Sequence, residues 1–135
     1  MEFVELAELL ARCDIVLVHA ALDAGTRGLL DRAAFQAMAR RPILVNVARG
    51  EIVEMEALLD ALESGQVSGA GLDVLWNEPP DWSSAGMRRL LAAENVLLSP
   101  HSGMHTDAAF RCLTRICLDN IEGFLSGHPA NVVSG

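Results

Sequence analysis

Four short, largely apolar runs alternate with helix-like stretches along this chain of 135 residues. The runs occupy residues 15–18, 43–47, 70–74 and 96–98. Continuous apolar runs are typical of strands in a parallel sheet that is covered on both faces. Alternating strands and helices are the pattern of an open α/β sheet with right-handed crossovers. We therefore expect an α/β fold of about four parallel strands with helices on both faces.

Helical periodicity marks the segments between these runs. Residues 54–64 form the clearest amphipathic stretch, and Gly65 follows it as a typical C-terminal stop. The apolar face of this stretch carries Met55, Leu58, Leu59 and Leu62. Further helices are expected over residues 4–12, 31–40, 87–92 and 106–126.

Charge and composition exclude several classes of protein. A formal charge of -8 argues against nucleic acid and anionic membranes as partners, because phosphate groups attract clustered Lys and Arg. No apolar run approaches the roughly 18 residues of a membrane-spanning helix, and the acidic start lacks the basic flank of a signal peptide. Cys13, Cys112 and Cys117 carry no metal-ligand spacing, so we expect reduced thiols in a cytoplasmic protein.

Polar side chains with catalytic potential stand at the end of each expected strand or shortly after it. His19 follows the first strand, Arg49 the second, Asp73 and Glu78 mark the third, and His101 follows the fourth. In a parallel sheet the carboxyl ends of all strands lie along one edge, which is where such sheets bind ligands. These groups are therefore predicted to converge on one site.

Arg49 lies in the segment Asn46-Val47-Ala48-Arg49-Gly50, directly after an apolar run. Its planar guanidinium can grip a carboxylate through two parallel hydrogen bonds, and its charge can polarise a neighbouring carbonyl. The alternative is an ordinary surface arginine on a loop. We favour anion binding, because the neighbours of Arg49 are apolar or glycine and no local acid pairs with it.

His101, Glu78 and Asp73 offer complementary chemistry. Histidine is the usual proton donor and acceptor in catalysis, contributing about 10²–10⁴-fold to the rate. A carboxylate beside it fixes its tautomer and favours the imidazolium. Asp73 interrupts an apolar strand and could accept a hydrogen bond from a ligand amide, such as a nicotinamide carboxamide. Taken singly, each group has a structural alternative: a core or cap histidine, a solvated glutamate, and an acid bonded to backbone N–H groups.

Two other patterns do not indicate a site. His101 and His105 are four residues apart, but no third ligand accompanies them, so no metal is expected. Gly65, Gly69 and Gly71 precede a strand, whereas a phosphate-binding loop follows a strand and opens a helix.

Taken together, these residues resemble the NAD-binding domain of the D-isomer-specific 2-hydroxyacid dehydrogenases, a family that includes phosphoglycerate dehydrogenase and the glyoxylate/hydroxypyruvate reductases. The similarity covers essentially the whole chain and keeps the order Arg, Asp, Glu, His. It is carried by Asp14-Ile15-Val16-Leu17-Val18-His19, Thr26-Arg27-Gly28-Leu29, Val45-Asn46-Val47-Ala48-Arg49-Gly50-Glu51-Ile52-Val53, Gly71-Leu72-Asp73-Val74 through Glu78-Pro79, Asn95-Val96 through Ser99-Pro100-His101, and the tail from Gly127 to Val133.

The resemblance implies a Rossmann-type fold and a role for each polar group. Arg49 would hold the substrate carboxylate, and His101 would be the general acid/base, paired with Glu78. A hydride would pass between the nicotinamide of NAD and C2 of a D-2-hydroxy acid or 2-oxo acid. Cofactor contacts would come from Ala20, Val47, Ala48, Arg49, Asp73, His101 and Gly103. The related formate dehydrogenases carry a glutamine at the position of Glu78, which argues against that activity.

The chain departs from the family pattern in what it lacks. The sequence has no G-x-G-x-x-G fingerprint, no acidic residue to read the ribose and no substrate domain. We therefore interpret residues 1–135 as the C-terminal half of an NAD(P)-binding Rossmann domain, lacking the first βαβ unit and inactive alone, with NADP not excluded. In the strand order 3-2-1-4-5-6, the strand at 15–18 is expected to be separated from the strand at 43–47 by two missing strands.

Two alternatives to an enzyme stay open at this point. One is a non-catalytic NAD-sensing or protein-interaction module, similar to the corepressors among the family's relatives. The other is a degenerate remnant. The presence of Arg49, Glu78 and His101 together favours the enzyme. Because the family usually dimerises through this domain, we expect a homodimer in the full-length parent.

Overall fold

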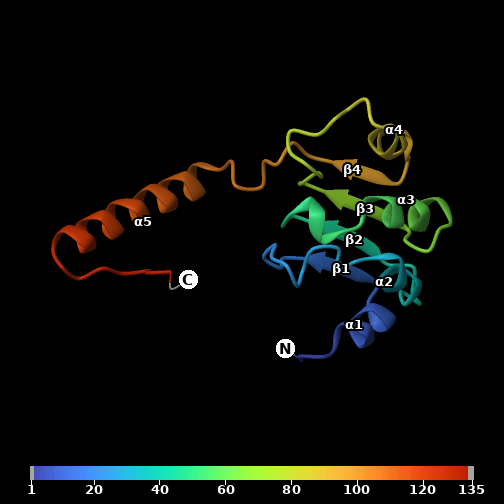
Figure 1. Ribbon diagram of the computed structural model, residues 1–135, viewed down its shortest axis with the longest axis horizontal. Helices are drawn as coiled ribbons and strands as arrows, with labels where there is room; N and C mark the ends of the chain where they lie inside the picture. The colour runs from blue at the N-terminus through green and yellow to red at the C-terminus, as the bar shows by residue number, and fades with distance from the viewer. Residues whose placement is uncertain (1, 134–135) are drawn as a thin grey trace. The chain divides into compact units, whose positions relative to one another are not determined.

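Four parallel strands form one sheet in the computed structural model, which describes residues 2–133 (Figure 1). The described chain divides into two units between His101 and Ser102. We call residues 2–101 the sheet unit and residues 102–133 the helix unit, and each is described by itself. The elements of the sheet unit are α1 (Leu6–Arg12), β1 (Ile15–Val18), α2 (Arg32–Gln36), β2 (Ile43–Asn46), the 3₁₀ helix η1 (Gly50–Ile52), α3 (Met55–Glu63), β3 (Gly69–Leu72), α4 (Ala85–Ala92) and β4 (Val96–Leu98).

The strands lie in the order in which they occur along the chain, β1-β2-β3-β4. β1 pairs directly with β2, and Ile15 lies opposite Ile43. The expectation that two missing strands separate these segments is therefore wrong. β2, β3 and β4 each add to the outside of the preceding strand, so the sheet grows in a single direction, as in the second half of a doubly wound fold.

The helices of the sheet unit cover one face of the sheet, whereas helices on both faces were expected. Strands that follow one another in order through right-handed crossovers place all of their helices on the same side. The burial of the strand residues also shows that only one face is covered. Val16, Leu44 and Ala70 lie in one row across the sheet and are buried. In the next row, Leu17 is 59% and Leu97 73% exposed. Within residues 2–101, nothing supplies a second helical layer.

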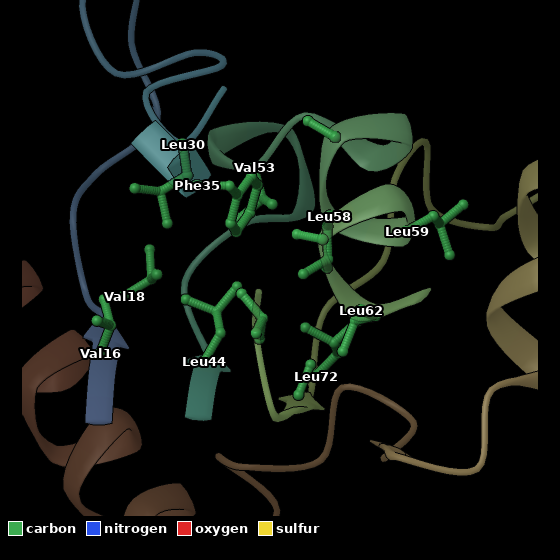
Figure 2. Close-up of a cluster of buried hydrophobic side chains, with 14 of the residues drawn as sticks. Val16, Val18, Leu30, Phe35, Leu44, Val53, Leu58, Leu59, Leu62 and Leu72 are labelled. Atoms are coloured by element: carbon green, nitrogen blue, oxygen red, sulfur yellow. The ribbon is translucent and has the colours of Figure 1, made fainter. Parts of the chain in front are cut away.

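One hydrophobic core joins the sheet to its helices. Figure 2 shows Leu58 and Leu62 of α3 pointing toward the strand residues Leu44 and Leu72. Phe35 of α2 belongs to the same cluster and is 2% exposed. The apolar spacing predicted for residues 54–64 therefore fixes the face that α3 (Met55–Glu63) turns to the sheet.

Replacing Leu58 by alanine is expected to lower the free energy of unfolding by about 2–5 kcal/mol, because Leu58 is fully buried and its loss leaves a cavity. The matched control is Leu97→Ala on the exposed face of β4, which should change the stability by less than about 0.5 kcal/mol. Urea denaturation of both variants measures the difference. Equal losses would contradict the assignment of the buried face.

The remaining sequence predictions differ from the structure at element ends, and the strands expected over 43–47 and 70–74 are β2 (Ile43–Asn46) and β3 (Gly69–Leu72). The helix expected over 31–40 is only α2 (Arg32–Gln36), because the chain turns before Pro42 and Arg41 adopts a left-handed φ of 51°. The structure also contains η1, which the periodicity did not predict. Next to η1, Leu30 and Val53 form an isolated parallel bridge.

The helix unit consists chiefly of α5 (Asp107–Leu125), close to the predicted range of 106–126. Thr106 caps its N-terminus by accepting a hydrogen bond from the backbone N–H of Ala109 at 3.1 Å. Among residues 2–133, no helix has the length and apolar character that crossing a membrane requires.

Candidate active site

The register of the sheet aligns the ends of all four strands. Val18, Asn46, Leu72 and Leu98 are successive partners across the sheet, and each is the last residue of its strand. The next residues along the chain, His19, Val47, Asp73 and Ser99, therefore leave the sheet at the same edge. This places the loops that carry Arg49, Glu78 and His101 together, as predicted from the strand pattern.

Asn46 shapes the loop that carries Arg49. Its side chain is 1% exposed, its Nδ2 donates to the carbonyl of Arg49 at 2.9 Å, and its Oδ1 accepts from the N–H of Ala48 at 3.0 Å. These two bonds fold residues 46–49 into a tight turn. The sequence analysis named Asn46 only as part of a motif, although a polar residue at the end of a buried strand signals such a role.

Replacing Asn46 by alanine is expected to cost about 1–3 kcal/mol of stability, because it removes both bonds and leaves the Ala48 N–H without its side-chain acceptor. Asn95→Ala is the control, since Asn95 is exposed and makes a single 3.3 Å bond to the carbonyl of Ser68. Thermal unfolding compares the two. An Asn46 variant no less stable than the Asn95 variant would contradict the role of this turn.

The guanidinium of Arg49 is available to an anion. The side chain lies in an exposed loop and its Nη1 donates to the carbonyl of Ala48 at 2.6 Å. Within residues 2–133, Arg49 makes no salt bridge, unlike Arg89, which contacts Glu56, Asp60 and Glu63. A cation that is held in place near a strand end without a salt bridge can receive a carboxylate.

A close backbone contact joins the Arg49 loop to the loop that carries Glu78. A Cβ atom at Gly50 would lie 2.5 Å from the carbonyl carbon and oxygen of Leu75 and 2.7 Å from the nitrogen of Trp76. The indole N–H of Trp76 donates to the carbonyl of Val53 at 2.6 Å in the buried interior. The position of Arg49 is thereby coupled to the position of Glu78.

Glu78 and His101 form a hydrogen-bonded pair. The Oε2 atom of Glu78 lies 2.6 Å from Nδ1 of His101, and its Oε1 accepts from the N–H of Leu75 at 2.8 Å. Burial raises the pKa of the Glu78 carboxyl, but these two bonds and the charges of His101 and Arg49 together lower it below its ordinary value. The guanidinium of Arg49 is thus near enough for its charge to act on the Glu78 carboxyl.

The tautomer of His101 follows from this pair. An ionised carboxylate can only accept hydrogen bonds, so Nδ1 of His101 donates to Glu78. The other ring nitrogen, Nε2, is then the atom that can exchange a proton with a ligand. A histidine paired with a carboxylate in this way is the arrangement predicted from the sequence for a general acid/base.

Glu78 also predicts a pH dependence of stability. Its pKa lies below the ordinary value of 4.5, so its interactions stabilise the fold above that pH and are lost as the pH falls through the lower folded-state pKa. Because its side chain is 36% exposed, the effect is expected to be only about 0.5–1 kcal/mol. Urea denaturation between about pH 6 and 3 should show a shallower fall for Glu78→Gln than for the wild type. Glu94→Gln, at an exposed position, should follow the wild type.

Asp73 and Ser99 meet at the ends of β3 and β4. The hydroxyl of Ser99 donates to Oδ1 of Asp73, and the backbone N–H of Ser99 donates to the carbonyl of Leu72 at 3.0 Å. Asp73 was expected inside a strand at 70–74, but β3 ends at Leu72, so this partly buried acid lies directly after the strand. From the sequence, Ser99 reads as an ordinary strand stop, because it precedes a proline.

An apolar groove borders the Glu78–His101 pair. Its volume is about 690 Å³. Its walls come from Leu75, Pro79, Pro80, Trp82, Leu91, Leu98 and Pro100, with Glu78, Ser99 and His101 also lining it. The two ionisable side chains therefore have a largely apolar surface beside them.

The other predicted residues take different positions. Ala20 lies two residues beyond β1 and is partly buried, and Val47 and Ala48 form the turn held by Asn46. Gly103 belongs to the helix unit, which is described separately from the sheet edge. His19 is exposed beyond β1. Residues 2–133 contain no group of three or more His, Cys, Asp or Glu side chains suited to a metal.

An open parallel sheet with a guanidinium, two acids and an imidazole at its carboxyl edge defines a nucleotide-dependent α/β enzyme domain as the class of protein. Comparison with known families supports this class. Residues 1–103 match the family described as D-isomer specific 2-hydroxyacid dehydrogenase, NAD binding domain. The chain belongs to this family, which confirms the resemblance and the prediction of an NAD-binding domain.

The individual proteins to which the chain is similar are dehydrogenases and reductases. The chain is 36% identical over 132 residues to the hydroxypyruvate reductase of Blautia hydrogenotrophica, with 98% of this chain and 40% of that protein covered. A D-isomer specific 2-hydroxyacid dehydrogenase from Lactobacillus delbrueckii ssp. bulgaricus, solved with NAD, superposes with a TM-score of 0.88 at 27% identity, covering 98% of this chain and 43% of that one. An acyclic imino acid reductase in complex with NADPH and D-Arg gives a TM-score of 0.86 at 27% identity, covering 97% and 40%. The chain thus spans about two fifths of the length of these proteins.

The residues present fit the nicotinamide end of NAD. Asp73 provides a partly buried carboxylate at the strand edge, bonded to Ser99, which lies two residues before His101. The fingerprint that would cradle the pyrophosphate does not occur in this sequence. The same scaffold is solved with NAD in one relative and with NADPH in another.

Proposed function

We propose that this chain supplies the acid/base and carboxylate-binding half of an NAD(P)-dependent D-2-hydroxyacid dehydrogenase. The observation that carries the proposal is the 2.6 Å contact between Glu78 and His101, at the edge where Arg49 offers a cation that makes no salt bridge within residues 2–133. NAD, when bound, carries the hydride that reduces a 2-oxo acid or accepts one from a 2-hydroxy acid.

Each side chain has a stated task in this proposal. Arg49 binds the substrate carboxylate through its forked N–H groups and polarises the adjacent 2-oxo group. His101 gives a proton from Nε2 to the substrate oxygen during reduction and removes it during oxidation. Glu78 holds the imidazole through Nδ1, which leaves Nε2 for the substrate. Asp73 accepts hydrogen bonds from the nicotinamide carboxamide, and Ala20, Val47 and Ala48 line the cofactor through backbone groups.

A chimera tests the proposal. In it, residues 1–135 replace the matching stretch of the Blautia hydroxypyruvate reductase, which supplies the G-x-G-x-x-G region. We expect the chimera to oxidise NADH with at least one member of a panel of 2-oxo acids. Arg49→Gln should raise KM for the 2-oxo acid and lower kcat/KM by about 10²-fold, because a charge-assisted grip on the carboxylate, worth about 3 kcal/mol, is lost. Arg27→Gln, in an exposed loop, is the matched control.

The outcomes separate enzyme from binding module. A folded chimera that binds NADH but reduces no 2-oxo acid would contradict the enzyme and favour the NAD-sensing alternative. The 135-residue chain alone should show negligible turnover, because it has no pyrophosphate-binding fingerprint. Tight binding of NAD to the isolated chain in calorimetry would refute this last statement.

Cellular location and oligomeric state are also part of the proposal. We infer a cytoplasmic enzyme from the three free cysteines. We infer a homodimer for the full-length parent because members of the family usually dimerise. Light scattering of the active chimera measures the second point. A monomer with full activity would contradict it.

A further inference from the structure

A short rigid turn carries the imidazole of His101. The backbone N–H of His101 donates to the carbonyl of Ser99 at 3.0 Å, so the chain closes a three-residue turn around Pro100. Proline fixes its own φ angle, which stiffens the centre of this turn. His101 has a φ of 52°, in the left-handed region that few residues other than glycine adopt. A movement at Ser99 is therefore transmitted to the ring of His101.

The turn is attached to the sheet at both ends through residues that follow β3. At its start, the Ser99 hydroxyl donates to Asp73, directly after β3. At its end, the His101 ring donates to Glu78, five residues further along the same loop. The backbone of Ser99 is also bonded to Leu72, the last residue of β3. Two side-chain bonds and one backbone bond thus define how the turn sits on the edge of the sheet.

We propose that Ser99 is a positioning residue, whose hydroxyl bond to Asp73 sets the orientation in which the Pro100 turn presents the His101 ring to Glu78. This proposal deepens the proposed function, on which its catalytic meaning rests. It also links two proposed roles. Asp73, which is proposed to bind the nicotinamide, and His101, which is proposed to transfer the proton, are then connected through Ser99 by hydrogen bonds and a short turn. Loss of the hydroxyl would leave the ring of His101 free to sample orientations in which Nδ1 does not face Glu78.

The first experiment reads the imidazole directly in the 135-residue chain. Nitrogen NMR of ¹⁵N-labelled protein, at a pH where His101 is neutral, distinguishes the Nδ1–H from the Nε2–H tautomer. The wild type should show mainly the Nδ1–H form, because Glu78 accepts from Nδ1. Ser99→Ala should show a substantial population of the Nε2–H form. Ser99→Thr, which keeps the hydroxyl, should resemble the wild type.

Ser68→Ala is the matched control. Its hydroxyl also donates one hydrogen bond, to the carbonyl of Pro42 at 3.2 Å, but Ser68 precedes β3 and so lies at the opposite edge of the sheet. The control should leave the His101 signals unchanged. If Ser99→Ala does not fold, Ser99→Cys takes its place, because a thiol has nearly the same shape and is a weaker donor.

Two results would overturn the proposal. The first is an unchanged tautomer in Ser99→Ala, or in Ser99→Cys where that variant is used. The second is a Ser99→Thr variant as disturbed as the alanine variant, since shape rather than the hydroxyl would then be responsible.

A second measurement links the hydroxyl to catalysis. In the chimera, Ser99→Ala should lower kcat roughly 10- to 100-fold and leave KM for NADH within about threefold, because a misplaced catalytic group slows the chemical step more than binding. Ser99→Thr should restore kcat. An alanine variant with wild-type kcat would overturn the proposal. A chimera that is inactive with wild-type Ser99 would instead count against the proposed function, and the NMR result would still decide the role of Ser99.

Discussion

His101→Asn is expected to lower kcat of the chimera by about 10²–10⁴-fold, the range that a general acid/base contributes. Asparagine is the informative replacement because it tolerates the left-handed φ of 52° at this position, so the turn around Pro100 is kept while the titrating ring is lost. The limb of the kcat/KM profile that depends on the imidazole should disappear with it. Steady-state NADH oxidation across pH measures both effects.

The control for His101→Asn is a second histidine four residues further along the chain. His105 stacks on Phe110 within the helix unit, with ring centroids 5.9 Å apart, and takes no part in the proposed chemistry. His105→Asn should retain kcat within about threefold, as expected of a side chain that does not touch the reacting atoms. A His101 variant that keeps more than about a tenth of the wild-type kcat would exclude His101 as the acid/base.

Gly50→Ala is expected to have the second largest effect, because the new Cβ would meet backbone atoms rather than the mobile end of a side chain. It would lie 2.5 Å from the carbonyl carbon and oxygen of Leu75, and real Cβ atoms essentially never approach so closely. Overpacking of this kind costs about 1–3 kcal/mol or more. The Arg49 loop would have to move away from the Glu78 loop to avoid this clash. Because Arg49 would then be misplaced, kcat/KM should also fall by about 10²-fold.

Gly71→Ala is the matched control for this substitution. Gly71 lies in β3, and the Cβ added there would be no closer than 3.8 Å to the Val45 side chain, which is an ordinary contact. Its stability in urea should stay within about 1 kcal/mol of the wild type. If Gly50→Ala is as stable as Gly71→Ala and retains activity, the close approach of the two loops is not what positions Arg49.

These two residues illustrate different limits of sequence interpretation. His101 could be named from its place after a strand, because direction in a parallel sheet decides the edge at which a residue emerges. The partner that fixes its tautomer, Glu78, came from the same reasoning, and the two side chains lie 2.6 Å apart. Gly50 gave no such signal, because its constraint is the backbone of a segment 25 residues further along the chain.

Sequence by itself determined the alternation of strand and helix, the four strands, the core face of α3 and the family. These depend on the spacing of apolar side chains and on residue types at strand ends, which are local properties. It did not determine that β1 lies directly against β2, nor that the helices of residues 2–101 share one face. Neighbouring strands are chosen by long-range packing, which periodicity along one segment does not encode.

Tertiary structure alone decided the finer geometry of the candidate site. It brought the Ser99 hydroxyl to Asp73, the backbone of Gly50 against Leu75, and the amide of Asn46 under Arg49. Two of these contacts join segments about 25 residues apart. All three depend on the conformation that the loops adopt once the strands are in register. A serine, a glycine and an asparagine are common in any loop, so only their placement distinguishes them.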